Sequence, residues 1–401
     1  MGKGILYQTL TTPGVACVAL CDIRVDVAVA CALELGIDHA VVESVTQLED
    51  AVRTRKVAIC ADGLFLSDST SVEILVEASS AITEGARFVT RAIETGKHVV
   101  LMNAEIDLAF GTHFLQLAEE HGVVVTSCDG DQHGVLKRQI DDMNLWGFET
   151  VMAGNIKGFL DRYANPTTII PEADKRKLNY KMCTAYTDGT KLCIEMALIA
   201  NALGLKTPLP GMTGPRADHV DEVLSLFDFE NIRASGKPVV DYILGARPGG
   251  GVYSVGYHDH PFQSFMMNYY KMGDGPFYVF YRPYHLCHVE SIASIVMPVL
   301  DKTALLTPSQ GIQTDTFAYA KKDLRPGEML DGIGGHACYG LIENVDDPAT
   351  HPGLQICVAE DVRLKNPIKK DQPILLADVE VDPLREDFKL RELAVAASRN
   401  G

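Results

Sequence analysis

One stretch of the chain, "YTDGTKLCIEMALIANALG" at residues 186–204, combines an acid and a lysine with the pattern of a long amphipathic helix. Asp188 lies three residues before Lys191, and Glu195 lies four residues after it. A lysine ammonium one turn from a carboxylate can polarise or protonate a substrate carbonyl during hydride transfer. The alternative is a surface ion pair between Lys191 and Glu195, which stabilises a helix by a few tenths of a kcal/mol. From the spacing alone, the ion pair is the simpler interpretation.

A second group of chemically capable residues lies in "FYRPYHLCHVE" at 280–290. Arg282 can hold a phosphate or a carboxylate through two parallel hydrogen bonds. His285 and His288 follow it closely and are candidates for acid–base groups or metal ligands. A structural role is the commoner one for a single histidine. We assign all three residues to substrate binding.

Two further motifs contain side chains whose oxygen atoms can bind a metal ion or a substrate. "CDGDQHG" at 128–134 brings Asp131 and Gln132 into one polar turn, and "GKHVVLMNAEID" at 96–107 contains Glu105. Crowded oxygens suit Mg²⁺ or Mn²⁺, so Glu105 and Asp131 are the candidate metal ligands. Glu105 is also a candidate general base, and Asp131 and Gln132 are candidate substrate contacts. The structural alternatives are an Asx turn for the first motif and a helix N-terminal acid for Glu105.

The start of the chain, "MGKGILYQTL", resembles the end of a nucleotide-binding loop, in which glycines let a helix N-terminus approach a pyrophosphate. A carboxylate that meets the ribose hydroxyls is expected about 20 residues further on, after the next strand. The alternatives are an ordinary frayed helix and a solvated acid. The glycines of the opening stretch and the acid after the next strand are predicted to bind the cofactor, together with polar residues near two later strand ends. The predicted cofactor-binding residues are Gly2, Gly4, Asp22, Arg24, Glu77, Ser79 and Asn103.

The elements that position these residues alternate along the first part of the chain. Apolar runs at 15–24, 74–79, 97–103 and 123–128 read as buried strands, with helical patterns at 25–36, 83–96 and 111–122 among them. Strands separated by helices of this size predict βαβ crossovers and a parallel sheet. Residues 190–205 and 288–300 predict helices, and 249–286 predict an antiparallel sheet. The last ninety residues read as a small all-β module.

Bulk properties narrow the class of protein. The 401 residues suffice for two or three domains, and the net charge of −17 argues against nucleic acid or an anionic membrane as the main partner. Ten scattered cysteines without a CxxC indicate reduced thiols in a cytoplasmic protein. We therefore expect a small-molecule substrate.

Taken together, these stretches resemble one family. "GKHVVLMNAE", "CDGDQHG", "YTDGTKLCIEMALIANALGL" and "YRPYHLCHVE" resemble the homoserine-dehydrogenase-like NAD(P)-dependent oxidoreductases that carry a C-terminal SAF domain. This group includes the second-type, DXR-like 1-deoxy-D-xylulose 5-phosphate reductoisomerases. "AKKDLRPGEMLDGIGG" and "KNPIKKDQPI" resemble its SAF-type β-clip. The resemblance covers essentially the whole chain.

The resemblance implies a three-part α/β protein and a catalytic pair. The parts are a Rossmann-type domain at 1–128, an α+β substrate and dimerisation domain at 129–310, and the SAF-like module at 311–401. Lys191 and Asp188 match the residues that serve the carbonyl in homoserine dehydrogenases. Glu105 stands where those enzymes have a lysine, and the Asp–Lys spacing is three rather than four, which argues against homoserine as substrate.

The implied activity is NAD(P)-dependent chemistry on a small, polar carbonyl or hydroxyl compound, either phosphorylated or not. Its sharpest version is conversion of 1-deoxy-D-xylulose 5-phosphate to 2-C-methyl-D-erythritol 4-phosphate, with NADPH or NADH and Mg²⁺ or Mn²⁺, by a homodimer. The alternatives are a dehydrogenase of a branched or acidic sugar derivative and a non-catalytic or truncated relative. The family pattern also places a strand and a Gly-x-Gly ahead of Met1. We therefore expect either an upstream extension of the gene product or weak cofactor binding.

Overall fold

The computed structural model describes residues 1–398 and contains two compact units. The first unit comprises Met1–Asp131 and Leu286–Thr307, and the second comprises Gln132–His285 and the chain from Pro308 onward. The predicted boundaries at 128 and 310 lie close to two of these junctions. The segment Leu286–Thr307, expected in the substrate domain, instead groups with the N-terminal unit.

The first unit alternates short strands and helices, as the sequence predicts. Its strands are β1 (Ala19–Cys21), β2 (His39–Val41), β3 (Val57–Cys60), β4 (Ile74–Glu77), β5 (His98–Leu101) and β6 (Val125–Ser127). Its helices are α1 (Gly2–Thr11), α2 (Val25–Glu34), α3 (Val45–Arg53), α4 (Leu64–Asp68), α5 (Thr83–Glu94), α6 (Ala104–His121) and α14 (Cys287–Leu300). The segment from β2 to α4 was not predicted in detail.

The strands of this unit form two parallel three-stranded sheets, in the orders β1-β3-β2 and β4-β5-β6. The parallel α/β class expected from the sequence is confirmed. Strands β1 and β4 are outer strands of their sheets. The expectation of a further strand ahead of residue 1 stays a prediction.

Helix α14 belongs to the first unit because its apolar face packs there. Ile295 joins Ile5 of α1 and Val100 and Met102 of the β5 region in one buried cluster. The Ser294 hydroxyl also accepts the backbone N–H of Asp129, at 2.8 Å. These contacts are long-range in sequence, which explains why the domain boundary was placed elsewhere.

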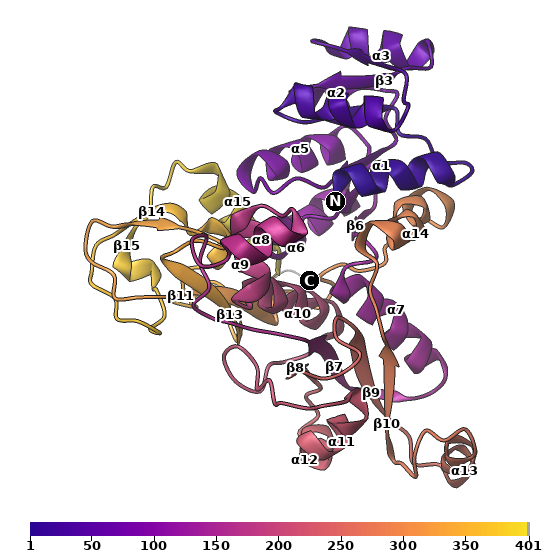
Figure 1. The fold of residues 1–401 in the computed structure, drawn as a ribbon, viewed down its shortest axis with the longest axis vertical. Coiled ribbons are helices and arrows are strands. Elements are labelled where there is room, and N and C mark those ends of the chain that lie inside the picture. Colours follow the sequence, from indigo (N-terminus) through magenta and orange to yellow (C-terminus); the bar gives the residue numbers. More distant parts are fainter. Residues whose placement is uncertain (399–401) are drawn as a thin grey trace. The chain divides into compact units, whose positions relative to one another are not determined.

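The second unit contains a four-stranded sheet of order β10-β9-β7-β8. Its strands are β7 (Glu149–Lys157), β8 (Val239–Leu244), β9 (Val252–Tyr257) and β10 (Phe277–Arg282). The accompanying helices are α7 (Gln132–Leu145), α8 (Ile170–Arg176), α9 (Tyr180–Thr187), α10 (Thr190–Leu203), α11 (Val223–Leu226), α12 (Phe229–Ala234) and α13 (Pro261–Tyr269). Figure 1 shows α13 at the end of the β9–β10 hairpin.

The C-terminal part of this unit is not all-β as expected. Strands β11 (Thr314–Ala320) and β13 (Cys338–Asn344) pair, and β12 (Met329–Asp331), β14 (Glu360–Leu364) and β15 (Val379–Glu380) form a second sheet. Helix α15 (Glu386–Ser398) follows and buries Phe388, Leu390 and Ala394. The prediction missed this helix because its residues were assigned to the small all-β module at the end of the chain. No helix among residues 1–398 is long and apolar enough to cross a membrane.

Candidate active site

The predicted acid–lysine pair lies at the junction of α9 and α10. Asp188 follows the end of α9, and Gly189 adopts the left-handed backbone (φ 87°) that turns the chain into α10. One Asp188 carboxylate oxygen accepts the Thr190 N–H at 2.8 Å, which satisfies a donor of the first helical turn. Nearly every residue of α10 is buried, so this is a core helix and not a surface helix.

Asp188 has a cationic partner from a distant part of the chain. Nζ of Lys321, just beyond the end of β11, lies 2.8 Å from Asp188 Oδ2 in an ion pair whose side chains are 3% and 0% exposed. Burial raises the pKa of Asp188, and the Lys321 charge opposes that rise. The sequence analysis expected Asp188 to orient Lys191. The structure instead assigns its Oδ2 to Lys321.

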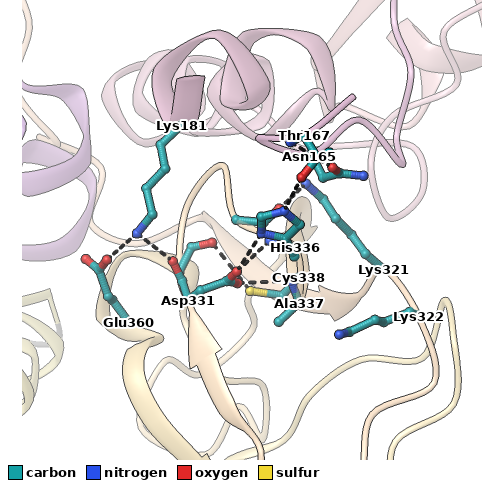
Figure 2. A network of polar contacts seen from close by, with 12 residues as sticks. Asn165, Thr167, Lys181, Lys321, Lys322, Asp331, His336, Ala337, Cys338 and Glu360 are labelled. Atoms are coloured by element: carbon teal, nitrogen blue, oxygen red, sulfur yellow. Dashed lines mark hydrogen bonds and ion pairs between the residues drawn. The ribbon is translucent and has the colours of Figure 1, made fainter. Parts of the chain in front are cut away.

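The Lys321 ammonium is held in place by backbone oxygens as well. It donates to the carbonyls of Ala164 and Gly335, at 2.7 and 2.8 Å. The Gly335 loop is fixed by Asp331, whose carboxylate accepts the N–H groups of His336 and Ala337 at 2.6 and 2.9 Å. Figure 2 shows Asp331 and His336 pointing toward each other in this loop. Lys321 is therefore a fixed charge beside Asp188.

Lys191 and Glu195 form a buried pair, with Nζ 3.7 Å from Glu195 Oε1 and side chains that are 8% and 3% exposed. The two groups do form an ion pair, but the pair is buried, so the interpretation that places it on the solvated surface is wrong. Lys157, at the end of β7, joins this region and donates to the Tyr186 carbonyl at 2.7 Å. Burial lowers the pKa of Lys157, while the charges of Glu195 and Asp188 raise it.

The cluster therefore contains three lysines and two carboxylates: Lys157, Lys191, Lys321, Asp188 and Glu195. Buried charges are costly unless partners neutralise them or a proton leaves. The cationic side chains of the cluster are suited to hold an anionic group or to exchange a proton.

Two neighbouring sheet positions add polar groups at the same end of the sheet. Arg282 at the end of β10 is in register with Val252, which is in register with Asn155 of β7. Asn155 lies two residues before Lys157, so both side chains leave the same face of the strand. Asn155 is 1% exposed, and its Nδ2 has no hydrogen-bond partner among the described residues. It is a donor available to a bound molecule.

The two histidines of the "FYRPYHLCHVE" stretch lie in different units. His285 Nδ1 contacts the Gly250 carbonyl at 2.6 Å in the second unit. His288 belongs to α14 in the first unit, where its ring covers Gly4 so closely that an added Cβ would lie 2.4 Å from it. The structure thus gives Gly4 a packing role against α14.

Three predicted cofactor residues meet at the carboxyl ends of β4 and β5. Glu77 is 6% exposed and accepts the Ser79 N–H at 3.1 Å, as well as the Ser79 hydroxyl. Asn103 caps α6 through the Ile106 N–H at 3.2 Å and donates to the Ala81 carbonyl at 3.1 Å. Burial raises the pKa of Glu77. Carboxyl ends of parallel strands are where α/β folds bind ligands.

The other predicted cofactor residues have local structural roles. One oxygen of Asp22 accepts the Arg24 N–H at 2.9 Å, at the entry to α2. Gly2 is the first residue of α1, and a Cβ on it would meet nothing within 4 Å.

The "CDGDQHG" turn is built around its first aspartate. Asp129 Oδ1 accepts the Gly130 N–H at 2.8 Å, and a Cβ on Gly130 (φ 95°) would lie 2.0 Å from the Cys287 carbonyl oxygen. Asp131 is 8% exposed, and Gln132 begins α7. This bond reaches only the next residue, whereas an Asx turn reaches two residues on, so the Asx-turn interpretation stays a prediction.

The metal prediction finds no support in the side-chain geometry. Glu105 lies half-buried in the first turn of α6. Among residues 1–398, no group of three or more His, Cys, Asp or Glu side chains is arranged to hold a metal ion. The assignment of Glu105 and Asp131 as metal ligands stays a prediction.

Sequence reasoning missed Lys157, Lys321 and Asn155. Lys321 stands in "AYAKKDLRP", which reads as a solvated turn, and Lys157 and Asn155 end an apolar strand. A polar residue at the end of a buried strand is a signal that could have identified Lys157 and Asn155. No local pattern links Lys321 to Asp188, because the two residues meet only through the fold.

Comparison with known families agrees with an enzymatic role. Residues 130–291 match the family described as "Oxidoreductase DRL, catalytic domain". The matched range includes Lys157, Asp188, Lys191 and Glu195. The chain therefore carries an oxidoreductase catalytic domain, and the expectation of an oxidoreductase enzyme is confirmed. No curated protein matches the chain.

Several solved structures are similar at low identity. A reductoisomerase from Zymomonas mobilis in complex with NADPH is 17% identical, with 49% of this chain and 53% of that chain covered and a TM-score of 0.34. A probable dehydrogenase from Thermotoga maritima is 10% identical, with 77% and 88% covered and a TM-score of 0.42. A putative myo-inositol dehydrogenase from Sinorhizobium meliloti 1021 is 12% identical, with 75% and 87% covered and a TM-score of 0.36. The chain spans about half the length of the first reductoisomerases it matches.

Proposed function

We propose that the chain is an NAD(P)-dependent oxidoreductase acting on a small hydroxyl or carbonyl compound that carries an anionic group. The sharpest form of the proposal is conversion of 1-deoxy-D-xylulose 5-phosphate to 2-C-methyl-D-erythritol 4-phosphate. The observation that carries the proposal is the buried lysine–carboxylate cluster at the start of α10, four of whose five residues lie inside the matched oxidoreductase domain. The alternative is a dehydrogenase of a branched or acidic sugar derivative.

The charge of the cluster supports an anionic substrate. Three lysines lie in this buried cluster, and burial lowers the pKa of Lys157. A phosphate or carboxylate bound nearby would be attracted by these cations. Arg282, in register with Val252 and through it with Asn155, provides a further cation at that end of the sheet.

Lys191 is the residue we assign to proton transfer. Its ammonium can donate a proton to a carbonyl oxygen during reduction, and its amine can accept a hydroxyl proton during oxidation. Glu195, 3.7 Å from Nζ, stabilises the charged form, and burial of both groups excludes water. Lys321 pairs with Asp188 in the same cluster. Asn155 Nδ2 is a donor for a substrate oxygen.

Nicotinamide binding is supported by the strand-end residues of the first unit. Asp22, Glu77, Ser79 and Asn103 fit the polar contacts of a dinucleotide, whereas Gly4 is covered by His288 and does not fit a phosphate contact. When bound, the nicotinamide supplies or accepts the hydride. The ten cysteines are free thiols, which supports a reducing compartment and hence our placement in the cytoplasm.

The test is a turnover assay with matched lysine variants. Purified protein is mixed with NADPH or NADH and a panel that contains 1-deoxy-D-xylulose 5-phosphate, branched sugar acids and homoserine, each with and without Mn²⁺. Lys191→Met should lower kcat by about 10³-fold, within the range for a lost proton-transfer group, and leave the cofactor Kd unchanged. Lys175→Met, on the exposed surface of α8, is the control.

The outcomes separate the alternatives. Turnover of the xylulose phosphate supports the sharp version, and turnover of a sugar acid alone supports the second. Unchanged kcat in Lys191→Met removes the catalytic assignment. Failure of both nicotinamides to bind would reject the proposed function for this chain.

A further inference from the structure

Two cysteines stand opposite each other at one end of the first parallel sheet. Cys21 ends β1, Cys60 ends β3, and the two residues are register partners. The Asp22 N–H donates to the Cys60 carbonyl at 3.1 Å, so the backbone ladder fixes their spacing. Neighbouring strands lie about 4.8 Å apart, which is inside the Cα–Cα range of about 4.4–6.8 Å that a disulfide spans.

The two side chains leave the same face of this sheet. Register partners point to the same side of a pleated sheet, and successive residues alternate between its faces. The preceding pair, Leu20 and Ile59, packs against α2. Cys21 and Cys60 therefore point to the opposite face, where their thiol groups form a hydrogen bond with each other.

The hydrogen bond between the thiols changes how they ionise. It lowers the pKa of Cys60. It also raises the pKa of Cys21, as do burial and the nearby charges of Asp62 and Asp22. The pair therefore releases its first proton more readily than a lone thiol and its second with difficulty, and the two sulfur atoms share the remaining proton. A thiolate with a thiol beside it is the arrangement from which a disulfide forms.

The two thiols differ in their access to solvent. Cys21 is exposed, and Cys60 is buried. The Cys60 Sγ lies 3.3 Å from the Asp62 carbonyl oxygen, which can accept the shared proton from Cys60. With the proton held there, the charge lies on Cys21, where a small oxidant can reach it.

We propose that Cys21 and Cys60 are a reversible redox pair that hydrogen peroxide converts to an intrachain disulfide. In the first step the Cys21 sulfur attacks a peroxide oxygen, the O–O bond breaks, and the released hydroxide takes a proton from solvent. The product is a sulfenic acid at Cys21. In the second step the Cys60 sulfur attacks the Cys21 sulfur, and the S–S bond forms as the S–O bond breaks. The leaving hydroxide takes the Cys60 proton, so two electrons pass from the sulfur atoms to the peroxide and two waters form.

The position of the pair connects it to ligand binding. It lies at the carboxyl ends of two parallel strands, the edge where α/β folds bind ligands, and Asp22 directly follows Cys21. Asp22 is the predicted ribose contact, so this connection rests on the proposed function. A dinucleotide bound at this edge would cover Cys21 and slow its oxidation.

The test is peptide mapping of the full chain after peroxide treatment. Reduced protein is exposed to millimolar hydrogen peroxide, the remaining thiols are blocked by alkylation, and the chain is cut with trypsin. Cys21 lies in the peptide 4–24 and Cys60 in the peptide 57–87. The two peptides should be joined, with a mass two hydrogens below their sum, and dithiothreitol should separate them.

Matched cysteine variants identify the sulfur atoms. Cys21→Ser, at an exposed position, should abolish the cross-link, and so should Cys60→Ala. Cys17→Ser should keep it, although Cys17 shares the peptide 4–24. Cys31→Ser is the control, because Cys31 is a partly exposed thiol of α2 in the same unit. Circular dichroism checks that each variant keeps its fold.

The outcomes decide the proposal. Absence of the cross-link at a peroxide concentration that oxidises Cys31 would overturn it, as would a cross-link that persists in Cys21→Ser. A disulfide between two chains, seen as a dimer on a non-reducing gel, in place of one within the chain would also overturn it.

A repeat in saturating NADP⁺, which does not itself reduce peroxide, tests the connection to the cofactor. The cross-link should form several-fold more slowly. An unchanged rate with NADP⁺ bound would overturn the connection between the pair and the cofactor site. Failure of NADP⁺ to bind would count against the proposed function, while the peptide map still decides the disulfide.

Discussion

Asp107 offers a prediction whose magnitude follows from the structure. It lies on α6, is wholly enclosed, and accepts a hydrogen bond from the Ser127 hydroxyl. Burial raises the pKa of Asp107 from 3.8 to about 7, because the charged form loses its hydration. The perturbation is Asp107→Asn, which has nearly the same shape, can still accept the Ser127 hydrogen bond and does not titrate.

The sign of the effect follows from proton binding. Between pH 3.8 and pH 7 the folded chain keeps the Asp107 proton that the unfolded chain has lost, so the free energy of unfolding falls as pH rises through this window. Above pH 7 both states are ionised and the loss is complete. The shift of about three pKa units corresponds to about 4 kcal/mol in total. About 2.5 kcal/mol of that loss falls between pH 5 and pH 8.

The assay is urea unfolding of wild type and Asp107→Asn at pH 5 and pH 8. The variant should gain about 2.5 kcal/mol relative to wild type on going from pH 5 to pH 8. Glu119→Gln, at an exposed position of the same helix, is the control and should track the wild type. Parallel pH dependence of wild type and Asp107→Asn would refute the argument that Asp107 is buried as a neutral acid.

Two further substitutions test buried contacts, one inside each unit. Lys321→Met should cost about 3–5 kcal/mol in unfolding free energy, because it leaves the Asp188 charge buried without its partner, and adding Asp188→Asn should restore at least half of that loss. If the double variant is no more stable than the single one, the pair is not the source of the loss. Gly130→Ala should cost clearly more than Gly96→Ala in a thermal melt. Both glycines have positive φ, but only an added Cβ at Gly130 meets a backbone atom, the Cys287 carbonyl oxygen. Equal losses would show that the close contact relaxes freely.

Local patterns predicted most elements of the first unit correctly, because strand and helix periodicities are properties of neighbouring residues. The strands around Glu77 and Asn103 and the helix that begins near Lys191 follow from such patterns. The sequence patterns did not predict the elements of segment 39–68, because its strands are three or four residues long and show little periodicity. Helix α15 was missed because the surrounding turns suggested a β module.

By itself, the sequence determined the α/β class and the placement of Asp188, Lys191 and Glu195 around one helix start. These depend on spacings of a few residues, which the helix and strand repeats convert directly into positions. The oxidoreductase expectation came from the resemblance of whole motifs to a known family. Tertiary structure decided that Lys321 pairs with Asp188, that α14 packs in the N-terminal unit, and that Phe262, Phe265 and Tyr269 of α13 face outward. Each of these depends on residues far apart in the chain, whose contacts arise only when buried surfaces are matched.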